Sequence, residues 1–240
     1  MTSHLAKTLL LLIGLVAGAN AQASFMTLDE LYLDFDTDGF GASIGAGQVI
    51  DDEYVTLGTW VDVTNHNKAL DQGMAFDTSN PVGDPDLANP GYGVGNTASN
   101  LLGNVLVVAA DGGSVPNDEE AVNVGMTYSS YVDFYFTETY LQGTVDLLDI
   151  EGAAASVLHG ARLDLIDDSS VVMSYEVASL GDNGLQTFAF GGVEFDSIRI
   201  NLTRGGGIDN LHLFTVPEPG ALTLLTLGAL VFTTRPKRQA

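Results

Sequence analysis

The chain has no cysteine among its 240 residues. Without thiols there is no disulfide, no thiolate nucleophile and no cysteine-ligated zinc site. The two ends of the chain, described below, predict export to an oxidising compartment, where small proteins often depend on disulfides. Burial of apolar side chains, or bound ions, must therefore supply the stability of this protein.

Basic residues are also scarce, with 8 lysines and arginines against 31 acidic residues and a net charge of −23. Four of the eight lie in the terminal segments, which leaves Lys68, Arg162, Arg199 and Arg204 for the rest of the chain. Binding a phosphate backbone or an anionic membrane depends on Lys and Arg. The composition excludes nucleic acid as a partner and suits high solubility, a saline habitat or binding of divalent cations.

Catalytic motifs are missing as well. The sequence contains no Gly-x-Ser-x-Gly, no His-Glu-x-x-His and no phosphate-binding loop, the patterns that mark common hydrolases and nucleotide-binding enzymes. A glycosidase needs only two carboxylates about 5–10 Å apart, and an acidic chain supplies many candidates. We predict a protein that is not an enzyme, and a polysaccharide-cleaving enzyme remains the alternative.

Residues 1–23 have the pattern of a secretory signal peptide. Lys7 supplies positive charge, residues 9–16 are mostly apolar, and small residues follow, including Ala21 and Ala23. This order predicts cleavage by signal peptidase after Ala21 or Ala23. The alternative, a permanent first membrane helix, does not fit the short apolar run or the small residues after it.

Residues 216–240 form a second tripartite segment. A Pro-Glu-Pro triplet precedes the apolar residues 220–232, and a basic cluster follows; the triplet and cluster are Pro217, Glu218, Pro219, Arg235, Lys237 and Arg238. The apolar stretch is shorter than the roughly 20 residues of a stable membrane span. Basic residues tend to stay on the cytoplasmic side. The segment therefore predicts a helix that inserts transiently into the inner membrane.

This tail closely resembles the PEP-CTERM sorting signal of Gram-negative bacteria that make extracellular polysaccharide. The resemblance implies that an exosortase-type protease recognises and removes the tail. It also implies a location in the periplasm, on the outer surface or in the extracellular matrix. The alternative is an amphipathic or buried C-terminal helix.

Residues 24–215 read as one all-β domain. Short runs of β-branched and aromatic residues alternate with polar residues, and Gly, Asn, Asp and Pro separate the runs. This pattern predicts an antiparallel β-sandwich or jelly roll, flanked by the signal helix and the hydrophobic sorting helix. The expected strands cover 28–35, 49–63, 104–109, 122–128, 131–136, 144–150, 161–166, 171–177, 185–190, 197–202 and 211–214. Between Asp77 and Asn100 we expect a long loop that is functional or mobile.

Several short stretches are similar to β-sandwich domains of PEP-CTERM proteins. They include Leu33-Asp34-Phe35-Asp36, residues 75–81 with 84–87, residues 103–106 and residues 208–211. That resemblance implies a jelly roll like those that bind carbohydrate.

The spacing Asp34-x-Asp36-x-Asp38-Gly39 starts like an EF-hand calcium loop. Position twelve is Gly45 instead of glutamate, so the segment is not an EF-hand. We predict a calcium site of Asp34, Asp36, Asp38 and Asp209 that joins the first and last strands, with Glu53 as a further candidate. The alternatives are a solvated acidic turn and, for Asp209, a pair with Arg204.

Two further groups of residues are candidates for binding. Asp77, Asp84 and Asp86 form a second oxygen-rich group in the long loop. Sugar rings stack on exposed aromatic side chains, for which Trp60 and Tyr92 are the candidates, although a lone Trp in a sandwich is more often buried. We predict an exported adhesion or carbohydrate-binding module with extracellular polysaccharide as its partner. The alternatives are the enzyme above and a purely structural matrix protein.

Overall fold

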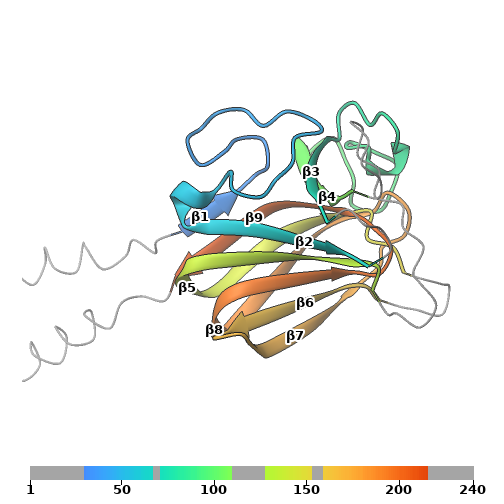
Figure 1. Cartoon of the computed structure of the whole chain (residues 1–240). Helices are drawn as coiled ribbons and strands as arrows, with labels where there is room; N and C mark the ends of the chain where they lie inside the picture. The colour runs from blue at the N-terminus through green and yellow to red at the C-terminus, as the bar shows by residue number, and fades with distance from the viewer. Residues whose placement is uncertain (1–29, 67–70, 110–127, 153–158, 216–240) are drawn as a thin grey trace, which may run out of the picture. The chain divides into compact units, whose positions relative to one another are not determined.

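The computed structural model describes residues 30–66, 71–109, 128–152 and 159–215 (Figure 1). Residues 30–215 form one compact unit. The predicted signal peptide, the predicted sorting segment with its triplet and basic cluster, and nearly all of the predicted strand 122–128 lie outside the described residues. Within the described part of the chain, no helix is long and apolar enough to cross a membrane.

The fold is all-β and antiparallel, as the residue alternation predicted. The strands are β1 (Glu30–Leu33), β2 (Thr59–Asn65), β3 (Gly73–Asp77), β4 (Asn104–Val108), β5 (Ser130–Leu148), β6 (His159–Asp167), β7 (Ser170–Ala178), β8 (Leu185–Leu202) and β9 (Gly207–Thr215). The helical elements among the described residues are two 3-10 turns, η1 (Val55–Leu57) and η2 (Pro85–Leu87).

The strands form two layers that share β5 and β8. The first layer has the strand order β2-β5-β8-β6-β7. It uses the first half of β5 and the second half of β8. In the second layer, β9 pairs with β1 and β4 on one side and with the second half of β5 on the other. The second half of β5 also pairs with the first half of β8. Register shifts between Tyr135 and Gln142 mark the change of layer along β5, as expected where a strand bends.

The inner faces of the two layers form one apolar core. Val132 and Phe134 of the first layer belong to the same buried cluster as Leu211 and Leu213 of the second. All four side chains are inaccessible to solvent. The two residues from each strand are separated by one position, so the pleat places both on the same face. This core compensates for the lack of disulfides.

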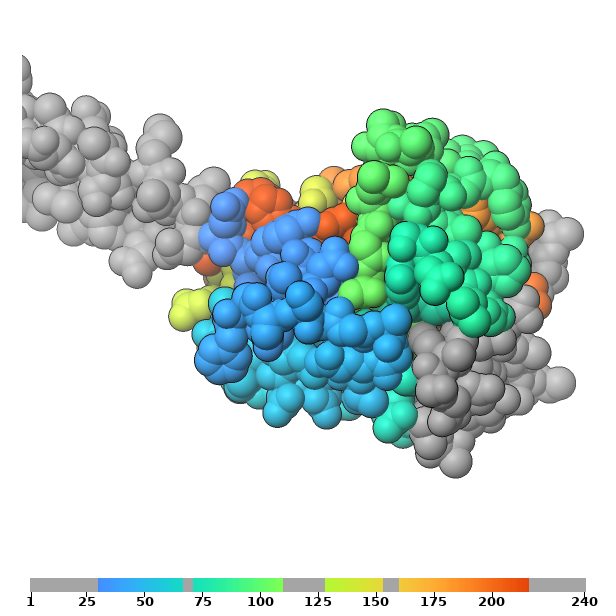
Figure 2. All heavy atoms as spheres, turned by 90° about the horizontal axis from the view of Figure 1, so that it is seen from above, coloured from blue at the N-terminus to red at the C-terminus, as the bar shows by residue number. Residues whose placement is uncertain are grey.

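The segment 78–103 covers the second layer instead of forming an open loop. Its Leu87 and Leu102 join Phe76 and Val105 in a separate buried cluster. Figure 2 shows this green segment beside the blue connection between β1 and β2. The predicted long loop between Asp77 and Asn100 is confirmed, since the described chain has only the short turn η2 between β3 and β4. Its close packing was not predicted, and buried Asn side chains bind its backbone, as described below.

The strands differ from the predictions in four places. The expected strand 49–63 is interrupted by η1 and by Gly58 at φ 73°, so β2 begins only at Thr59. Strand β3 was not predicted, since Gly73 and Met74 give it a weak strand pattern. The runs 131–136 and 144–150 belong to the single long strand β5, and 185–190 and 197–202 both lie in β8.

Candidate functional site

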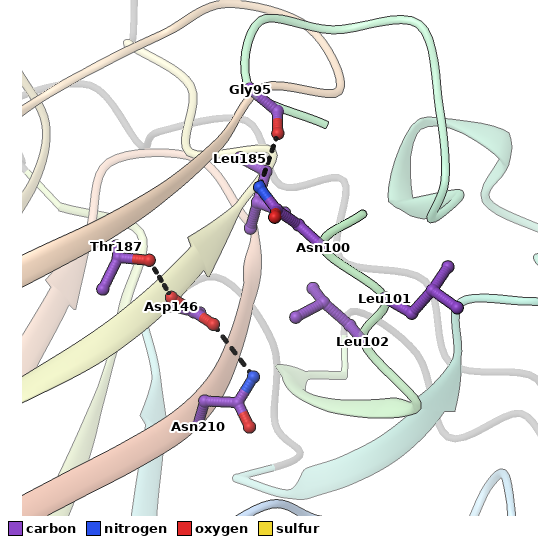
Figure 3. A pocket seen from close by; sticks show the side chains of 8 residues that line it. All are labelled: Gly95, Asn100, Leu101, Leu102, Asp146, Leu185, Thr187 and Asn210. Atoms are coloured by element: carbon purple, nitrogen blue, oxygen red, sulfur yellow. Dashed lines mark hydrogen bonds between the residues drawn. The ribbon is translucent and has the colours of Figure 1, made fainter. Parts of the chain in front are cut away.

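A cavity of about 240 Å³ lies where β5, β8 and β9 meet the end of the 78–103 segment (Figure 3). Asp146, Thr187 and Asn210 supply its polar side, one from each strand, and Asn100 faces them from the segment. Leu101, Leu102 and Leu185 supply apolar surface. The cavity thus combines hydrogen-bonding groups with apolar wall.

Asp146 organises the polar side of this cavity. The Thr187 hydroxyl donates to Oδ1 of Asp146, and Nδ2 of Asn210 donates to Oδ2 at 2.9 Å. The Tyr32 hydroxyl in turn donates to Oδ1 of Asn210. Asn210 has φ 49° at a register shift between β5 and β9, a conformation that asparagine tolerates better than most residues. The bulge turns Asn210 towards Asp146.

Asp209, one of the predicted calcium ligands, is the buried neighbour of Asn210. Its side chain is 2% exposed, and its Oδ1 accepts the backbone N–H of Asn210 at 2.7 Å. Burial raises the pKa of Asp209 to about 9, and the nearby charges of Asp36, Asp146 and Asp34 add to the increase. Ionised Asp209 is therefore costly unless a positive charge reaches it.

The other predicted calcium ligands bind backbone groups. Oδ1 of Asp34 accepts the N–H groups of Asp36 and Thr37 at 3.1 and 3.0 Å. Oδ1 of Asp38 accepts the N–H groups of Phe40 and Ala42, both at 2.8 Å. These two carboxylates hold their own turn in place.

Asp36 connects the same turn to the second layer. Its Oδ1 accepts the backbone N–H of Asn104, the first residue of β4, at 2.7 Å. A Cβ on Gly103 would lie 2.1 Å from Oδ2 of Asp36, so this position has no room for a side chain. Asp34, Asp36 and Asp38 thus all accept backbone N–H groups, and the charges of Asp34 and Asp36 act on Asp209.

Three-residue carboxylate groups with ligand atoms within 4.8 Å of one another occur elsewhere in the described chain. They are Asp51, Asp52 and Glu53, and Asp149, Glu151 and Asp182. The predicted set of Asp34, Asp36, Asp38 and Asp209 does not form such a group among the described residues. The alternative partner of Asp209 is wrong too, because Arg204 pairs with Glu151 at 3.0 Å.

Tyr54 adds an unusual polar atom near Asp34 and Asp209. Its side chain is 2% exposed, and its hydroxyl makes no hydrogen bond of standard geometry among the described residues. Burial raises the pKa of Tyr54, and the charges of Asp34 and Asp209 raise it further. A backbone hydrogen bond with Phe35 opposes this increase, so the contact that the hydroxyl makes is weak for a buried group.

Trp60 lies on the outer face of the first layer, directly opposite Tyr135. The two side chains are 41% and 43% exposed, so Trp60 is not a core residue. On the same face, Arg199 binds both oxygens of Asp133 at 2.7 Å and covers the ring of Tyr131 at 3.9 Å. The face therefore presents aromatic rings next to ion pairs.

Tyr92, the other predicted stacking residue, is 65% exposed on the 78–103 segment. Its hydroxyl donates to Asp86 at 2.7 Å and to Asp182 at 2.9 Å, and these hydrogen bonds raise the pKa of Tyr92. The predicted group of Asp77, Asp84 and Asp86 is split: Asp77 binds Ser79, Asp86 binds Tyr92, and Asp84 is buried.

Asn183 ties this segment to the turn before β8. Its Oδ1 accepts the N–H groups of Tyr92 and Gly93, and its Nδ2 donates to the carbonyl groups of Asp86 and Ala88. Asn183 is fully buried with φ 55°. Asn183 thus holds the predicted loop together with the buried Asn89 and Asn96, which also bind its backbone.

No known family profile matches the chain, and no curated protein matches its sequence. Among solved structures, it is similar to a family 32 carbohydrate-binding module of Clostridium perfringens in complex with galactose (11% identity, 69% of this chain, 97% of the other, TM-score 0.31). It is also similar to a Streptococcus pneumoniae fucose-binding module (13%, 48% and 73%, 0.28).

A third similar structure is the allantoicase of Saccharomyces cerevisiae (9% identity, 70% of this chain, 43% of the other, TM-score 0.35). These TM-scores describe a partial overlap of strands, and they do not place the chain in any of these families.

The sequence did not predict the residues of the cavity. Asp146, Thr187 and Asn210 are single polar residues in separate strands, and only the pairing of β5 with β8 and β9 brings them together. The one available signal was the Asp209-Asn210 pair in an otherwise apolar strand.

Proposed function

We propose that this protein is an exported, non-enzymatic carbohydrate-binding protein and that a sugar residue occupies the cavity beside Asp146. The observation that carries this proposal is the array in which Asp146 binds both Thr187 and Asn210. A carboxylate, an amide and a hydroxyl together offer the donors and acceptors that sugar hydroxyls need. At about 240 Å³ the cavity is smaller than drug-sized sites of roughly 300–1,000 Å³, which suits one sugar residue.

The walls of the cavity fit the same ligand. Leu101, Leu102 and Leu185 provide apolar surface for the C–H groups of a sugar ring. The polar side chains are already held by one another, so binding orders few rotamers, and preorganisation of this kind increases affinity.

Calcium assistance is part of the proposal. Asp209 supplies an oxygen ligand of the type Ca²⁺ prefers, and the nearby negative charges of Asp34 and Asp36 would attract the ion towards it. A cation there offsets the cost of burying ionised Asp209. Because Asp209 also binds the Asn210 backbone, the ion would steady the cavity.

Export and sorting rest on the sequence. We propose that signal peptidase removes residues 1–23 and that an exosortase-type protease processes the tail at the Pro217-Glu218-Pro219 triplet, which directs the protein to the extracellular polysaccharide matrix. Intact mass spectrometry of the protein recovered outside the cell tests this, because an unprocessed mass would contradict both steps.

Binding to a glycan array, followed by calorimetry with the best glycan in calcium buffer, tests the cavity. We expect Asp146→Ala and Thr187→Val to weaken binding at least tenfold. Glu138→Gln is the matched control, since Glu138 is an exposed carboxylate of β5 that does not line the cavity. Unchanged affinity in both cavity variants, or no glycan bound at millimolar concentration, would refute the proposal. Release of reducing sugar would favour the enzyme alternative.

A further inference from the structure

The outer face of the first layer carries a second arrangement suited to a ligand. Trp60 on β2 and Tyr135 on β5 are a directly opposed pair, and facing residues of antiparallel strands have Cα atoms about 4.5–5.5 Å apart. Both rings are more than two-fifths exposed. Large exposed aromatic side chains at facing positions of a sheet are unusual for a surface that only meets water.

A second group of residues lies farther along the same face of β5. Tyr131 is four residues from Tyr135, a separation of about 13 Å at 3.3 Å per residue, and Arg199 covers its ring at 3.9 Å. Strands β2, β5, β8 and β6 lie side by side in this layer (Figure 1). The surface from the exposed Trp60 and Tyr135 to this covered ring is therefore longer than a single sugar ring.

Polar groups next to the rings are held in fixed positions. Asp133 is 3% exposed beneath Arg199, and Asp164 is 1% exposed beneath Arg162. Asn201 donates to Asp164 at 2.9 Å. These contacts leave the arginines half-buried at the surface, where guanidinium N–H groups can donate to ligand oxygens.

The charge of this face favours a neutral ligand. Both arginines are neutralised by buried carboxylates at 2.7 and 2.8 Å, and the whole chain has a net charge of −23. An anionic polymer would be repelled by such a protein. A neutral polysaccharide has no such penalty, and its ring faces stack on aromatic side chains while its hydroxyls reach the ion pairs.

We propose that the outer face of the first layer binds an extended, neutral polysaccharide chain laid across Trp60 and Tyr135. This surface is made of residues other than those of the cavity, which belongs to the second layer and its covering segment. A protein with both sites holds two glycan chains at once and so cross-links them.

Native gel electrophoresis in gels with and without hydroxyethylcellulose tests the proposal. We expect the polysaccharide to retard the wild-type protein, and Trp60→Ala and Tyr135→Ser to reduce the retardation at least fivefold. Tyr92→Ser, which removes an exposed aromatic ring outside this face, should migrate like the wild type. Asp146→Ala should remain retarded, which separates this surface from the cavity.

Tryptophan fluorescence gives a readout that does not depend on a variant's folding. Trp60 is the only tryptophan in the chain, so stacking on it should shift or quench the whole emission of the wild-type protein. Alginate, an anionic polymer, should cause neither retardation nor a change in emission. The proposal is overturned if hydroxyethylcellulose leaves the emission and migration of the wild type unchanged, if both face variants stay retarded, or if alginate alone binds.

Discussion

Asp209 and Asn210 are consecutive residues of β9, yet one is buried and the other lines a cavity. The backbone N–H of Asn210 donates to Asp209 at 2.7 Å, and its side-chain amide donates to Asp146 at 2.9 Å. The buried carboxylate and the cavity are therefore connected through one residue. Any ion that binds Asp209 acts on the proposed sugar site by this route.

Calcium should stabilise the fold through Asp209. At a concentration 100 times Kd, a bound ion adds about 2.7 kcal/mol to the free energy of unfolding, which for a domain of this size raises Tm by roughly 5–10 °C. Thermal melts with Ca²⁺, Mg²⁺ or a chelator measure this. We expect the Ca²⁺ shift to disappear in Asp209→Asn.

Asp38→Asn is the informative comparison for that melt. Asp38 belongs to the sequence-predicted ligand set, but its carboxylate holds its own turn, so this variant should keep the calcium shift. Equal stabilisation by Mg²⁺, or an undiminished shift in Asp209→Asn, would show that no calcium site involves Asp209.

Stability should fall as pH rises from about 5 to 8, in part because of Asp149. Burial raises the pKa of Asp149 in the folded protein to about 8, although a hydrogen bond from the Asn183 backbone N–H lowers it. In the unfolded chain the pKa of an aspartate is about 3.9. The folded state then binds more protons than the unfolded state between these values, so unfolding becomes easier with increasing pH.

The variant Asp149→Asn tests this pH dependence. It keeps an acceptor for the Asn183 N–H group and removes the titration, so its Tm should fall by several degrees less than that of the wild type between pH 5 and 8. Thermal melts at each pH in the presence of a chelator are the measurement. Parallel pH profiles for the two proteins would contradict the assignment to Asp149.

Replacing Asn183 should loosen the 78–103 segment. Asn183→Ala removes two donors and an acceptor and leaves buried backbone groups without partners, at a cost on the order of 3 kcal/mol or more. Urea unfolding should show the loss, and hydrogen exchange should show faster exchange at Tyr92 and Gly93. Asn80→Ala, at an exposed turn of the same segment, should change neither; equal effects of the two variants would refute the role of Asn183.

Removing Arg199 should cost more than removing it together with Asp133. Arg199→Met leaves a carboxylate with 4% side-chain exposure without its cation, which typically costs about 3–5 kcal/mol. The double variant Arg199→Met with Asp133→Leu should recover much of that loss. Urea unfolding of both variants decides this, and a double variant less stable than the single one would contradict the argument.

The alternating pattern of the strands predicted the fold class because burial on one face leaves a period of two in the sequence. Ser197 to Leu202 shows it well, with Ile198, Ile200 and Leu202 all fully buried. The sequence did not predict that the runs 131–136 and 144–150 form one strand, because residues 135–142 include exposed polar residues that look like a turn. The bend that takes β5 from one layer to the other depends on tertiary packing.

The residues of the candidate sites were also predictable only in part. Asp34, Asp36 and Asp209 were predicted to be near one another from the chemistry of calcium alone, and the structure places Asp34 and Asp36 close enough to raise the pKa of Asp209. Asp146 and Thr187 were not predicted, because their association depends on the register between β5 and β8. Exposure of Trp60 also required the structure, since strand period does not say which face is outward.

Strand β9 lies between β1, β4 and β5, and it ends at Thr215. A pull applied beyond Thr215 therefore acts along the strand, while its hydrogen bonds to both neighbours are perpendicular to that direction. Such bonds share the load and must break together, so the domain should resist mechanical unfolding when it is pulled at this end.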